Sequence, residues 1–282
     1  MSNFVKSPLN YVGGKYKLLP QIVPLFPKDV NVFIDVFSGG GNVGVNVNAN
    51  KIICNDINKP VIDWCNECLN RDSEDFLEEL DNVIKRYGLS KTNQEGFLSI
   101  REDYNNGHNS PVMFYAMLTH AFNYQIRFNS SGGYNMPFGK NRSSFNLSLR
   151  KKFTSFVDRL KEIDITFTNS DFRDINLDKL QKDDLVYCDP PYLITTASYN
   201  EQDGWNESRE IELLEILDNV DKAGSRFALS NVLENKGKVN DILVEWTKKY
   251  NVHHLNYDYS NSSYQTKDRT KNSTKEVLIT NY

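Results

Sequence analysis

The sequence predicts an α/β protein in which an open, mostly parallel sheet carries a mainly helical insertion. Short apolar runs that end at acidic or glycine-rich motifs alternate with segments whose apolar residues recur every three or four positions, which is typical of strands alternating with helices. Residues 60–122 contain only the helical spacing, which indicates the insertion. A length of 282 residues with 39% hydrophobic residues fits one globular domain with a large insertion, or two domains that share a core.

The first element is a glycine turn that is followed at once by a lysine. Gly13 and Gly14 precede Lys15, and the apolar positions over residues 18–23 then follow helical spacing. A glycine turn, a lysine and a helix start together favour an anion site. The spacing is not that of a Walker A loop, which needs four residues between its glycines and a Lys-Ser/Thr pair. A helix start with a solvated lysine is the simpler alternative.

A strand, a glycine-rich turn and an expected helix follow over residues 32–47. The buried strand includes Asp35, the turn contains Phe37, Gly39 and Gly41, and the valines at positions 43, 45 and 47 predict a continuation into a helix. This order is the βα unit of a nucleotide-binding sheet, in which glycines let the backbone approach a cofactor closely. The spacing of the glycines is a weak signal by itself.

A second short strand over residues 51–55 ends at Asp56. In Rossmann-like sheets an acid at this place accepts a hydrogen bond from a ribose hydroxyl. Asp56 is therefore the candidate for the main cofactor acid, with Asp35 as the competing choice. A helix N-cap before Pro60 is the structural alternative for Asp56.

Two cysteines within the helical segment raise the question of a metal site. Cys65 and Cys68 form a C-x-x-C motif, which could be half of a zinc site or a redox pair. The chain has no second such pair, and its four histidines are not at ligand spacing. The expectation is two thiols on one helix face and no metal.

Residues 124–152 combine a turn signal with an unusual density of aromatic, amide and basic residues. Ser-Gly-Gly predicts a β-hairpin turn, and aromatics alternate with Arg, Asn and Lys on both arms. Such side chains can wedge between bases, contact base edges and bind phosphates. The candidates are Phe128 as a wedge, Arg127, Asn129 and Asn135 as base-contacting residues, and Lys140 and Arg142 in a basic strip. An aromatic hairpin that packs on the helical segment is the structural alternative.

The remaining chain returns to alternating strands and helices. Asp171 follows a predicted strand and is a further candidate for cofactor binding. The predicted elements are a helix at 153–160, strands at 163–168 and 185–188, a helix at 211–220, a strand at 226–230, a helix at 239–250 and closing strands at 252–257 and 276–279.

The strand at 185–188 leads into Asp-Pro-Pro-Tyr, and this is the stretch most suggestive of chemistry. Two consecutive prolines supply no backbone N–H and restrict φ, so the strand must end at Asp189. A rigid loop at the carboxyl end of a strand is where open α/β sheets bind ligands. Asp189, the Pro190 carbonyl and the ring of Tyr192 are suited to hold a planar base by its amino group and to stack on it. A simple strand-ending turn is the alternative.

Charge and hydropathy restrict the expected location and partners of the protein. The net charge of −4 and the pI of about 5.7 argue against a protein that coats nucleic acid, but they allow local basic strips. Two strips occur, one at Lys140, Arg142, Arg150, Lys151 and Lys152 and one at Lys267, Arg269, Lys271 and Lys275. No apolar run approaches the roughly 18 residues of a membrane span, and no signal-peptide core begins the sequence, so a cytoplasmic protein without membrane contact is expected.

These motifs, in this order, resemble the Dam-like (D12 class) DNA adenine-N6 methyltransferases. The resemblance is carried by Asn-Tyr-Val-Gly-Gly-Lys, Asp-Val-Phe-Ser-Gly-Gly-Gly, Asn-Asp-Ile-Asn, Asn-Met-Pro-Phe-Gly-Lys, Tyr-Cys-Asp-Pro-Pro-Tyr and Leu-Ser-Asn, which together span nearly the whole chain. It implies a Rossmann-like, S-adenosylmethionine (AdoMet) dependent sheet over residues 1–59 and 160–282. Residues 60–159 would then form an inserted, mainly helical target-recognition domain that carries a β-hairpin.

The resemblance also implies roles for individual residues. Cofactor contacts are expected from Tyr11, Lys15, Asp56 and Asp189, with Tyr11 replacing the tryptophan of the family's best-known members. Arg127-Phe128-Asn129 matches the family's hairpin Arg-Tyr-Asn, with a phenylalanine in place of the tyrosine.

The implied reaction is methyl transfer from AdoMet to N6 of an adenine flipped out of double-stranded DNA, without a metal. The resemblance points to a restriction-modification methylase, with a separate cognate restriction endonuclease as an expected partner. The alternatives are methylation of cytosine-N4 or RNA adenine, or an inactive DNA-binding protein. A C5-cytosine methylase would need a nucleophilic cysteine, usually after a proline, whereas Cys188 precedes Asp189 and should point to the opposite face of its strand.

Overall fold

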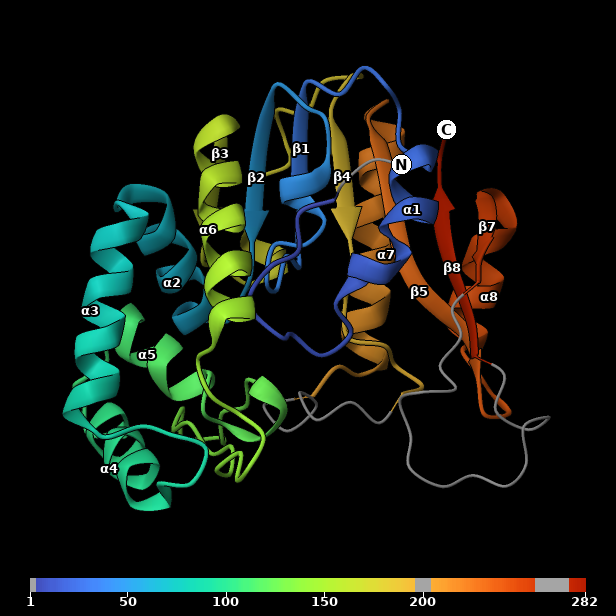
Figure 1. Cartoon of the computed structure of the whole chain (residues 1–282). Helices are drawn as coiled ribbons and strands as arrows, with labels where there is room; N and C mark the ends of the chain where they lie inside the picture. The colour runs from blue at the N-terminus through green and yellow to red at the C-terminus, as the bar shows by residue number, and fades with distance from the viewer. Residues whose placement is uncertain (1–3, 196–203, 257–273) are drawn as a thin grey trace.

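A computed structural model describes residues 4–195, 204–256 and 274–282 and contains, within them, an eight-stranded sheet (Figure 1). The strands follow the order β3-β2-β1-β4-β5-β8-β7, with the short β6 paired to β5. Neighbours from β3 to β5 are parallel, whereas β8 runs antiparallel to both β5 and β7. The strands are β1 (Val32–Asp35), β2 (Lys51–Asn55), β3 (Ile165–Thr168), β4 (Leu185–Cys188), β5 (Arg226–Asn235), β6 (Lys238–Val239), β7 (Asn251–Leu255) and β8 (Thr274–Thr280).

Helices cover both faces of this sheet. Those described are α1 (Leu19–Ile22), α2 (Lys59–Asn70), α3 (Ser73–Arg86), α4 (Gln94–Asn105), α5 (Pro111–Leu118), α6 (Leu147–Glu162), α7 (Glu207–Lys222) and α8 (Asp241–Trp246). Polar side chains that accept hydrogen bonds from first-turn N–H groups begin most of the longer helices, as Asn146 does for α6 and Asn206 for α7. None of the described helices has the length and the apolar character needed to cross a bilayer.

The alternation of side chains along β4 divides the core into two layers. Leu185 and Tyr187 pack with residues of α1, α2 and α6, whereas Val186 and Cys188 pack with residues of α7 and α8 on the other face. In Figure 1, α1 and α6 accordingly lie on the near side of the strands and α7 lies behind them. The prediction that Cys188 points to the face opposite Asp189 is confirmed, because Asp189 bonds to a residue on the α1 side.

The prediction that residues 60–122 are helical is confirmed. Helices α2 to α5 occur between β2 and β3 in the chain, and α5 is buried over its whole length from Val112 to Leu118. A helix that is apolar all round must be surrounded by other elements, and α5 contacts α2, α3 and α4. These helices extend beyond the β3 edge of the sheet, where an aromatic cluster of Trp64, Phe76 and Phe153 joins them to α6 (Figure 1).

The prediction of a helix after the glycine-rich turn is wrong. Residues Gly44–Asn46 make a single 3₁₀ turn and the chain becomes extended at Val47. The Asn46 side chain explains the break, because it exchanges hydrogen bonds with the backbone of Val5 and binds the carbonyl of Asn42. The turn also packs directly on β2, since a Cβ on Gly44 would lie 2.3 Å from the Sγ atom of Cys54.

Two further boundaries differ from the prediction. The helix expected at 239–250 is shorter, because Val239 belongs to β6 and α8 ends at Trp246 before a 3₁₀ turn over Thr247–Lys249. The strand expected at 226–230 is longer, because β8 pairs with β5 as far as Asn235. Tyr257, at the end of a predicted strand, lies outside the described residues, as do Lys267, Arg269 and Lys271 of the second basic strip.

Candidate active site

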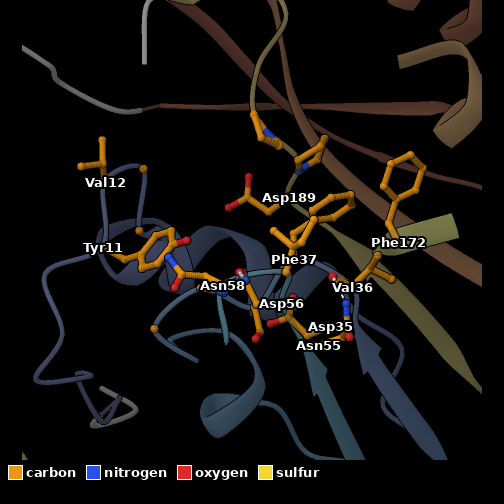
Figure 2. A pocket seen from close by; sticks show the side chains of 18 of the residues that line it. Tyr11, Val12, Asp35, Val36, Phe37, Asn55, Asp56, Asn58, Phe172 and Asp189 are labelled. Atoms are coloured by element: carbon orange, nitrogen blue, oxygen red, sulfur yellow. Dashed lines mark hydrogen bonds between the residues drawn. The ribbon is translucent and has the colours of Figure 1, made fainter. Parts of the chain in front are cut away.

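A cavity of about 670 Å³ opens at the carboxyl ends of β1, β2 and β4. Most of the predicted site residues line it, namely Tyr11, Lys15, Asp35, Phe37, Gly39, Asp56, Phe128, Asp171, Asp189, Pro190 and Tyr192. Figure 2 shows the Asp189 carboxylate projecting into the space between Tyr11 and Phe37, with Asp35 and Asp56 along one side. The sheet therefore brings together motifs that are far apart in the sequence, at the place where parallel sheets bind ligands.

Asp56 organises the glycine turn of the cavity. Its Oδ2 atom accepts a hydrogen bond from the Gly39 N–H at 2.8 Å, and its Oδ1 atom accepts one from the Asn58 N–H at 2.8 Å. Burial raises the pKa of Asp56, and these two N–H groups partly offset the effect. Each carboxylate oxygen can accept a second hydrogen bond, so the structural role leaves room for a ligand hydroxyl.

Gly39 allows the ring of Tyr11 to lie against the turn. Gly39 has φ +49°, and a Cβ at this position would lie 3.0 Å from the Tyr11 ring. Gly41 also has a positive φ of 76°, but it makes a turn beside Phe156 and does not line the cavity. Of the two predicted cofactor glycines, only Gly39 therefore faces the site.

Asp35 is a buried acid with spare hydrogen-bonding capacity. It is 1% exposed, and its Oδ1 atom has no hydrogen-bond partner among the described residues. Burial raises the pKa of Asp35 well above its usual range, and the nearby charges of Asp189 and Asp56 add to the effect. An unsatisfied buried carboxyl at a cavity wall is costly unless a ligand supplies the partner.

Asp189 is held by two groups at a single oxygen. Its Oδ1 atom lies 2.8 Å from the Nζ atom of Lys15 and accepts a hydrogen bond from the Tyr192 hydroxyl at 3.1 Å. Burial raises the pKa of Asp189, and the Lys15 ammonium partly offsets this rise. Within the described part of the chain, Oδ2 accepts no hydrogen bond, so this second oxygen can accept from a ligand.

Lys15 is itself buried, with 4% exposure, and does not end in solvent as the simpler alternative supposed. Its ammonium donates to the carbonyl of Gly13 at 3.0 Å and lies 5.0 Å from the centre of the Tyr192 ring. Burial lowers the pKa of Lys15, but the charges of Asp189 and Glu276 outweigh burial and raise it overall.

Glu276 is a member of this cluster that the sequence did not reveal. It lies in β8, is 1% exposed, and its Oε1 atom is 3.2 Å from the Tyr192 hydroxyl and 3.6 Å from Lys15 Nζ. The available signal was a charged residue directly before the buried apolar run Val277–Ile279.

An aromatic wall forms another side of the cavity. Trp205 packs edge-on against Phe37 with ring centres 5.6 Å apart, and it packs at a tilt against Phe172 with ring centres 5.5 Å apart. The Trp205 indole donates to the buried Glu210 carboxylate, which fixes the ring. Neither Phe172 nor Trp205 was predicted as a site residue, although the position of Phe172 beside Asp171 was a usable signal. Such a wall suits a planar apolar ring.

Asp171 lies beside this wall and is paired with Arg173. The guanidinium donates from Nε to Oδ1 at 2.8 Å and from Nη2 to Oδ2 at 2.9 Å. These hydrogen bonds lower the pKa of Asp171. The residue is therefore an ionised acceptor at the rim of the cavity.

The predicted base-contacting residues make contacts with one another and with their own turn. Arg127 donates from Nε to the Asn135 side chain at 2.7 Å and from Nη2 to the Asn135 carbonyl at 3.1 Å. The Asn129 side chain accepts from the N–H groups of Ser131 and Gly133 and so stabilises the turn. None of these three predicted side chains lines the cavity.

Phe128 does line the cavity, but its ring is partly buried. It stacks on Phe114 with ring centres 6.3 Å apart and packs edge-on against Tyr134 at 5.5 Å. An antiparallel bridge also joins Phe128 to Tyr134. The aromatic packing that was named as the structural alternative is therefore present.

Lys140 and Arg142 are exposed, as a phosphate-binding role would require. Arg142 lies 5.0 Å from the centre of the exposed Phe122 ring and donates to the Asn123 side chain at 3.4 Å. Asn123 has φ +54°, and its carbonyl accepts from Asn10 at 2.7 Å, beside the first glycine turn. The basic strip is thus linked through Asn123 and Asn10 to the residue before Tyr11 of the cavity.

The C-x-x-C thiols lie on α2, where Cys65 and Cys68 are both buried in the hydrophobic core. Burial raises the pKa of both thiols. Over residues 4–195, 204–256 and 274–282, no group of three or more His, Cys, Asp or Glu side chains is arranged to hold a metal ion.

Comparison with known proteins agrees with the motifs. Residues 11–261 match the model of the D12 class N6 adenine-specific DNA methyltransferases. The chain is 50% identical over its whole length to the type II methyltransferase M.FokI of Planomicrobium okeanokoites, of which the match covers 43%. It is 45% identical over 99% of its length to the modification methylase StsI of Streptococcus sanguinis, again covering 43% of that protein.

A more distant relative is matched over a larger share of its own length than M.FokI and StsI are. The DNA adenine methylase of Vibrio cholerae is 28% identical over 70% of this chain and 69% of its own length. The chain spans less than half the length of its two more similar relatives. Because both the family model and these relatives cover nearly all of the sequence, the chain belongs to the D12 class of N6 adenine-specific DNA methyltransferases.

Proposed function

We propose that this chain transfers the methyl group of AdoMet to N6 of an adenine that is flipped out of double-stranded DNA at a specific site. The observation that carries the proposal is the Asp-Pro-Pro-Tyr loop, in which Asp189 offers its Oδ2 atom to the cavity beside Tyr192. A target base inside a duplex cannot be reached by such a recessed carboxylate, so it must leave the base stack.

The cavity fits AdoMet in its donor and acceptor groups. Asp56 and Asp35 have acceptor capacity for hydroxyl groups, and Asp35 Oδ1 is a buried atom that needs a partner. Phe37, Phe172 and Trp205 form a wall for an adenine ring, and Asp171 offers an acceptor beside it. We expect Tyr11, held against Gly39, to cover another side of the cofactor.

The chemistry of the step needs positioning more than acid or base catalysis. When bound, AdoMet would supply an electrophilic methyl group: the N6 lone pair would form the new N–C bond while the S–C bond breaks and its electron pair stays on sulfur. Asp189 Oδ2 and the Pro190 carbonyl would accept the two N6 hydrogens, which withdraws the lone pair from the ring and directs it at the methyl group. We expect Asp189 also to accept the proton that N6 then loses.

Tyr192 would hold the flipped base by stacking. Unstacking a base costs a few kcal/mol, and stacking on an aromatic side chain returns about 1–3 kcal/mol of that cost. The ring is suited to this task because its hydroxyl is fixed by Asp189 and Glu276.

We propose that residues 60–159 form the DNA target-recognition part, in which the turn around residues 127–135 makes a short β-hairpin. Phe128 would be the wedge, Arg127, Asn129 and Asn135 the base-contacting residues, and Lys140 and Arg142 the phosphate ligands. The contacts between Arg127 and Asn135 support a preorganised recognition surface. The boundary at residue 160 lies inside α6, so the two parts share this helix.

The relatives that are named modification methylases support a further proposal, that the enzyme protects DNA from a separate cognate restriction endonuclease. The chain matches 43% of the length of M.FokI and of StsI, so the activity of those whole proteins does not by itself establish transfer by this chain. Transfer by this chain alone is therefore the first property to measure.

The test is methyl transfer from labelled AdoMet to genomic DNA that lacks prior methylation, followed by nucleoside analysis and mapping of the modified positions. N6-methyladenine at one short motif is the expected result. N4-methylcytosine would keep the catalytic loop and change the base, and transfer only to RNA would overturn the role given to residues 124–152. Absence of transfer together with absence of AdoMet binding would favour an inactive DNA-binding protein.

A further inference from the structure

We propose that Glu276 is a positioning residue for methyl transfer: its carboxylate holds the Tyr192 hydroxyl and shares the Lys15 ammonium with Asp189. The inference rests on the function proposed above and adds a residue that does not line the cavity. Glu276 would act through Tyr192 and Lys15 and would not touch the substrate.

The place of Glu276 in the sheet brings it to the catalytic loop. In the parallel pair β4–β5, Cys188 is opposite Leu229, and three residues further along β5 Val232 is opposite Glu276 of β8. Glu276 therefore lies just beyond the carboxyl end of β4, level with the Asp-Pro-Pro-Tyr loop. Its side chain meets Tyr192 there, at 3.2 Å between Oε1 and the hydroxyl oxygen.

Burial of this carboxylate is not explained by stability. Glu276 is 1% exposed and is followed in β8 by the buried Val277 and Leu278. A buried ion pair is often replaced by apolar residues without loss of stability, because removing the charges from water costs about as much as their attraction returns. If β8 only contributed to the hydrophobic core, an apolar residue would be sufficient at position 276.

The geometry instead makes Glu276 a competitor of Asp189 for two donors. The Tyr192 hydroxyl has a single proton and lies 3.1 Å from Asp189 Oδ1 and 3.2 Å from Glu276 Oε1, so it donates to one of them at a time. The Lys15 ammonium lies 2.8 Å from Asp189 and 3.6 Å from Glu276. Without Glu276, both donors would interact more strongly with Asp189 and make its carboxylate a weaker acceptor for the substrate amino group.

Glu276 also fixes the orientation of the Tyr192 ring. The hydroxyl is held from the β8 side by Glu276, while Lys15 Nζ lies 5.0 Å from the ring centre. A ring that is restrained at its far end keeps one plane for a stacked base. Loss of that restraint would misplace the target amino group, and a displacement of about 1 Å can lower a rate about 100-fold.

The experiment compares Glu276→Leu, Glu276→Gln and a control, Thr280→Val, in the full chain. Thr280 lies in the same strand, is fully buried and has its hydroxyl contacts with His253 and Tyr282, away from the loop. We expect kcat for methyl transfer to fall about 100-fold in E276L and about tenfold in E276Q. AdoMet affinity, measured by calorimetry, should stay at the wild-type level in both Glu276 variants. In T280V, kcat should also stay at the wild-type level.

A double-mutant cycle with Tyr192→Phe tests the route of the effect. Y192F keeps the ring and removes the hydroxyl through which Glu276 acts. If the inference is right, E276L costs at least about tenfold less in the Y192F background than in the wild type. Equal costs in the two backgrounds would overturn the route through Tyr192.

The pH dependence of kcat gives a readout that a purely structural role would not change. Asp189 is faced by Lys15, Tyr192, Glu276, Asp35 and Tyr187. The Glu276 charge contributes to the raised pKa of Asp189, so its removal in E276Q should move the acidic limb of the kcat profile to lower pH. The limb should not move in T280V.

The outcomes separate this inference from the proposed function. If kcat and its pH profile are unchanged in both Glu276 variants, the inference is overturned. Adenine methylation by the wild-type chain would still support the proposed function. If the wild-type chain methylates no DNA, the function fails, and crystal structures of the wild type and E276L then decide the inference. A displaced Tyr192 ring in E276L supports it, and an unmoved ring overturns it.

Discussion

The ammonium nitrogen of Lys15 lies 2.8 Å from Oδ1 of Asp189, with the lysine side chain almost fully buried. This ion pair joins the first glycine turn to the loop that follows β4. Lys15, which the resemblance assigns to the cofactor, therefore also contacts Asp189, whose carboxylate is assigned to the target base. A cofactor bound beside Lys15 would therefore affect the charge on Asp189, and the two halves of the site are coupled through one side chain.

Replacement of Asp189 by alanine should lower the rate of methyl transfer at least about 100-fold and leave the fold intact. Asp189 is the acceptor proposed for the adenine amino group, and loss of a preorganised polar group of this kind costs about 10²–10³ in rate. The fold should persist because Lys15 keeps Glu276 as a partner at 3.6 Å. Single-turnover transfer to unmethylated DNA measures the effect, and circular dichroism checks the fold.

The matched control for this variant is Asp183→Ala, which removes a carboxylate just before the opposite end of the same strand. It should retain wild-type transfer. Wild-type turnover in D189A would remove Asp189 from the reaction and with it the reading of the Asp-Pro-Pro-Tyr loop.

Replacement of Lys15 by methionine should destabilise the protein in a pH-dependent manner. The change leaves Asp189 and Glu276 close to one another without their cation, and loss of one partner of a buried pair costs about 3–5 kcal/mol. Without the ammonium, the pKa of Asp189 rises further above its unfolded value, so the folded state binds a proton more tightly than the unfolded state. The free energy of unfolding of K15M should then increase as the pH falls.

Urea denaturation at pH 8 and pH 5 measures this difference. In the wild type the pKa of Lys15 is raised, so its stabilisation is present below the unfolded-state pKa of about 10.4 and is lost only as pH rises through the higher folded value. The deficit of K15M relative to wild type should therefore be larger at pH 8 than at pH 5. The control K59M breaks an exposed pair and should cost less than about 1 kcal/mol at both pH values. An equal deficit for K15M at both pH values would contradict the coupling of Lys15 to Asp189.

The sequence predicted those parts of the site that depend on residues close together in the chain. Strand β4 had to end at Asp189 because two prolines follow, and Asp56 ends an apolar run. Both side chains lie at the carboxyl edge of one sheet, as parallel strands require. Local patterns of this kind survive folding because they depend on neighbours in the chain.

The parts that the sequence missed depend on long-range pairing. Glu276 reaches Tyr192 only because β8 inserts between β5 and β7 with one particular register. The pairing of Arg127 with Asn135 likewise needs the turn to close, and each residue alone suggested a free base-contacting side chain. The missing helix after the glycine turn has the same origin, since Asn46 bonds to Val5 in a distant segment.

Replacement of Gly39 by alanine should weaken AdoMet binding through Tyr11. The new Cβ would lie 3.0 Å from the Tyr11 ring, and φ of +49° is unfavourable for alanine. We expect the ring to be displaced and the dissociation constant for AdoMet, measured by calorimetry, to rise about tenfold. Gly237→Ala is the control, because it has φ +80° and nothing within 4 Å of its Cβ.

The double variant with Tyr11→Ala distinguishes ring displacement from backbone strain. If G39A acts by pushing the ring away, it should cost little affinity once the ring is absent. The same tenfold loss in the Y11A background would assign the effect to the turn itself and to the Gly39 N–H that bonds Asp56.

Variants of the basic strip and of Arg127 should separate DNA affinity from DNA sequence preference. Lys140→Gln combined with Arg142→Gln should weaken binding to all DNA sequences and reduce the slope of log K against log salt by about 2, because both side chains are exposed and suited to phosphates. Arg86→Gln, an exposed arginine on α3, is the control and should change neither quantity.

Arg127→Ala should act differently, because this guanidinium is held in place by Asn135 and presents a fixed donor pattern. A base contact of this kind is worth about 1–3 kcal/mol of discrimination, so we expect methylation to spread to sites that differ at one base pair while the salt slope stays nearly constant. Single-molecule mapping of modified adenines measures the spread. A uniform loss of affinity with unchanged site preference would place Arg127 among the phosphate contacts, and the turn at residues 127–135 would then position the duplex without selecting its sequence.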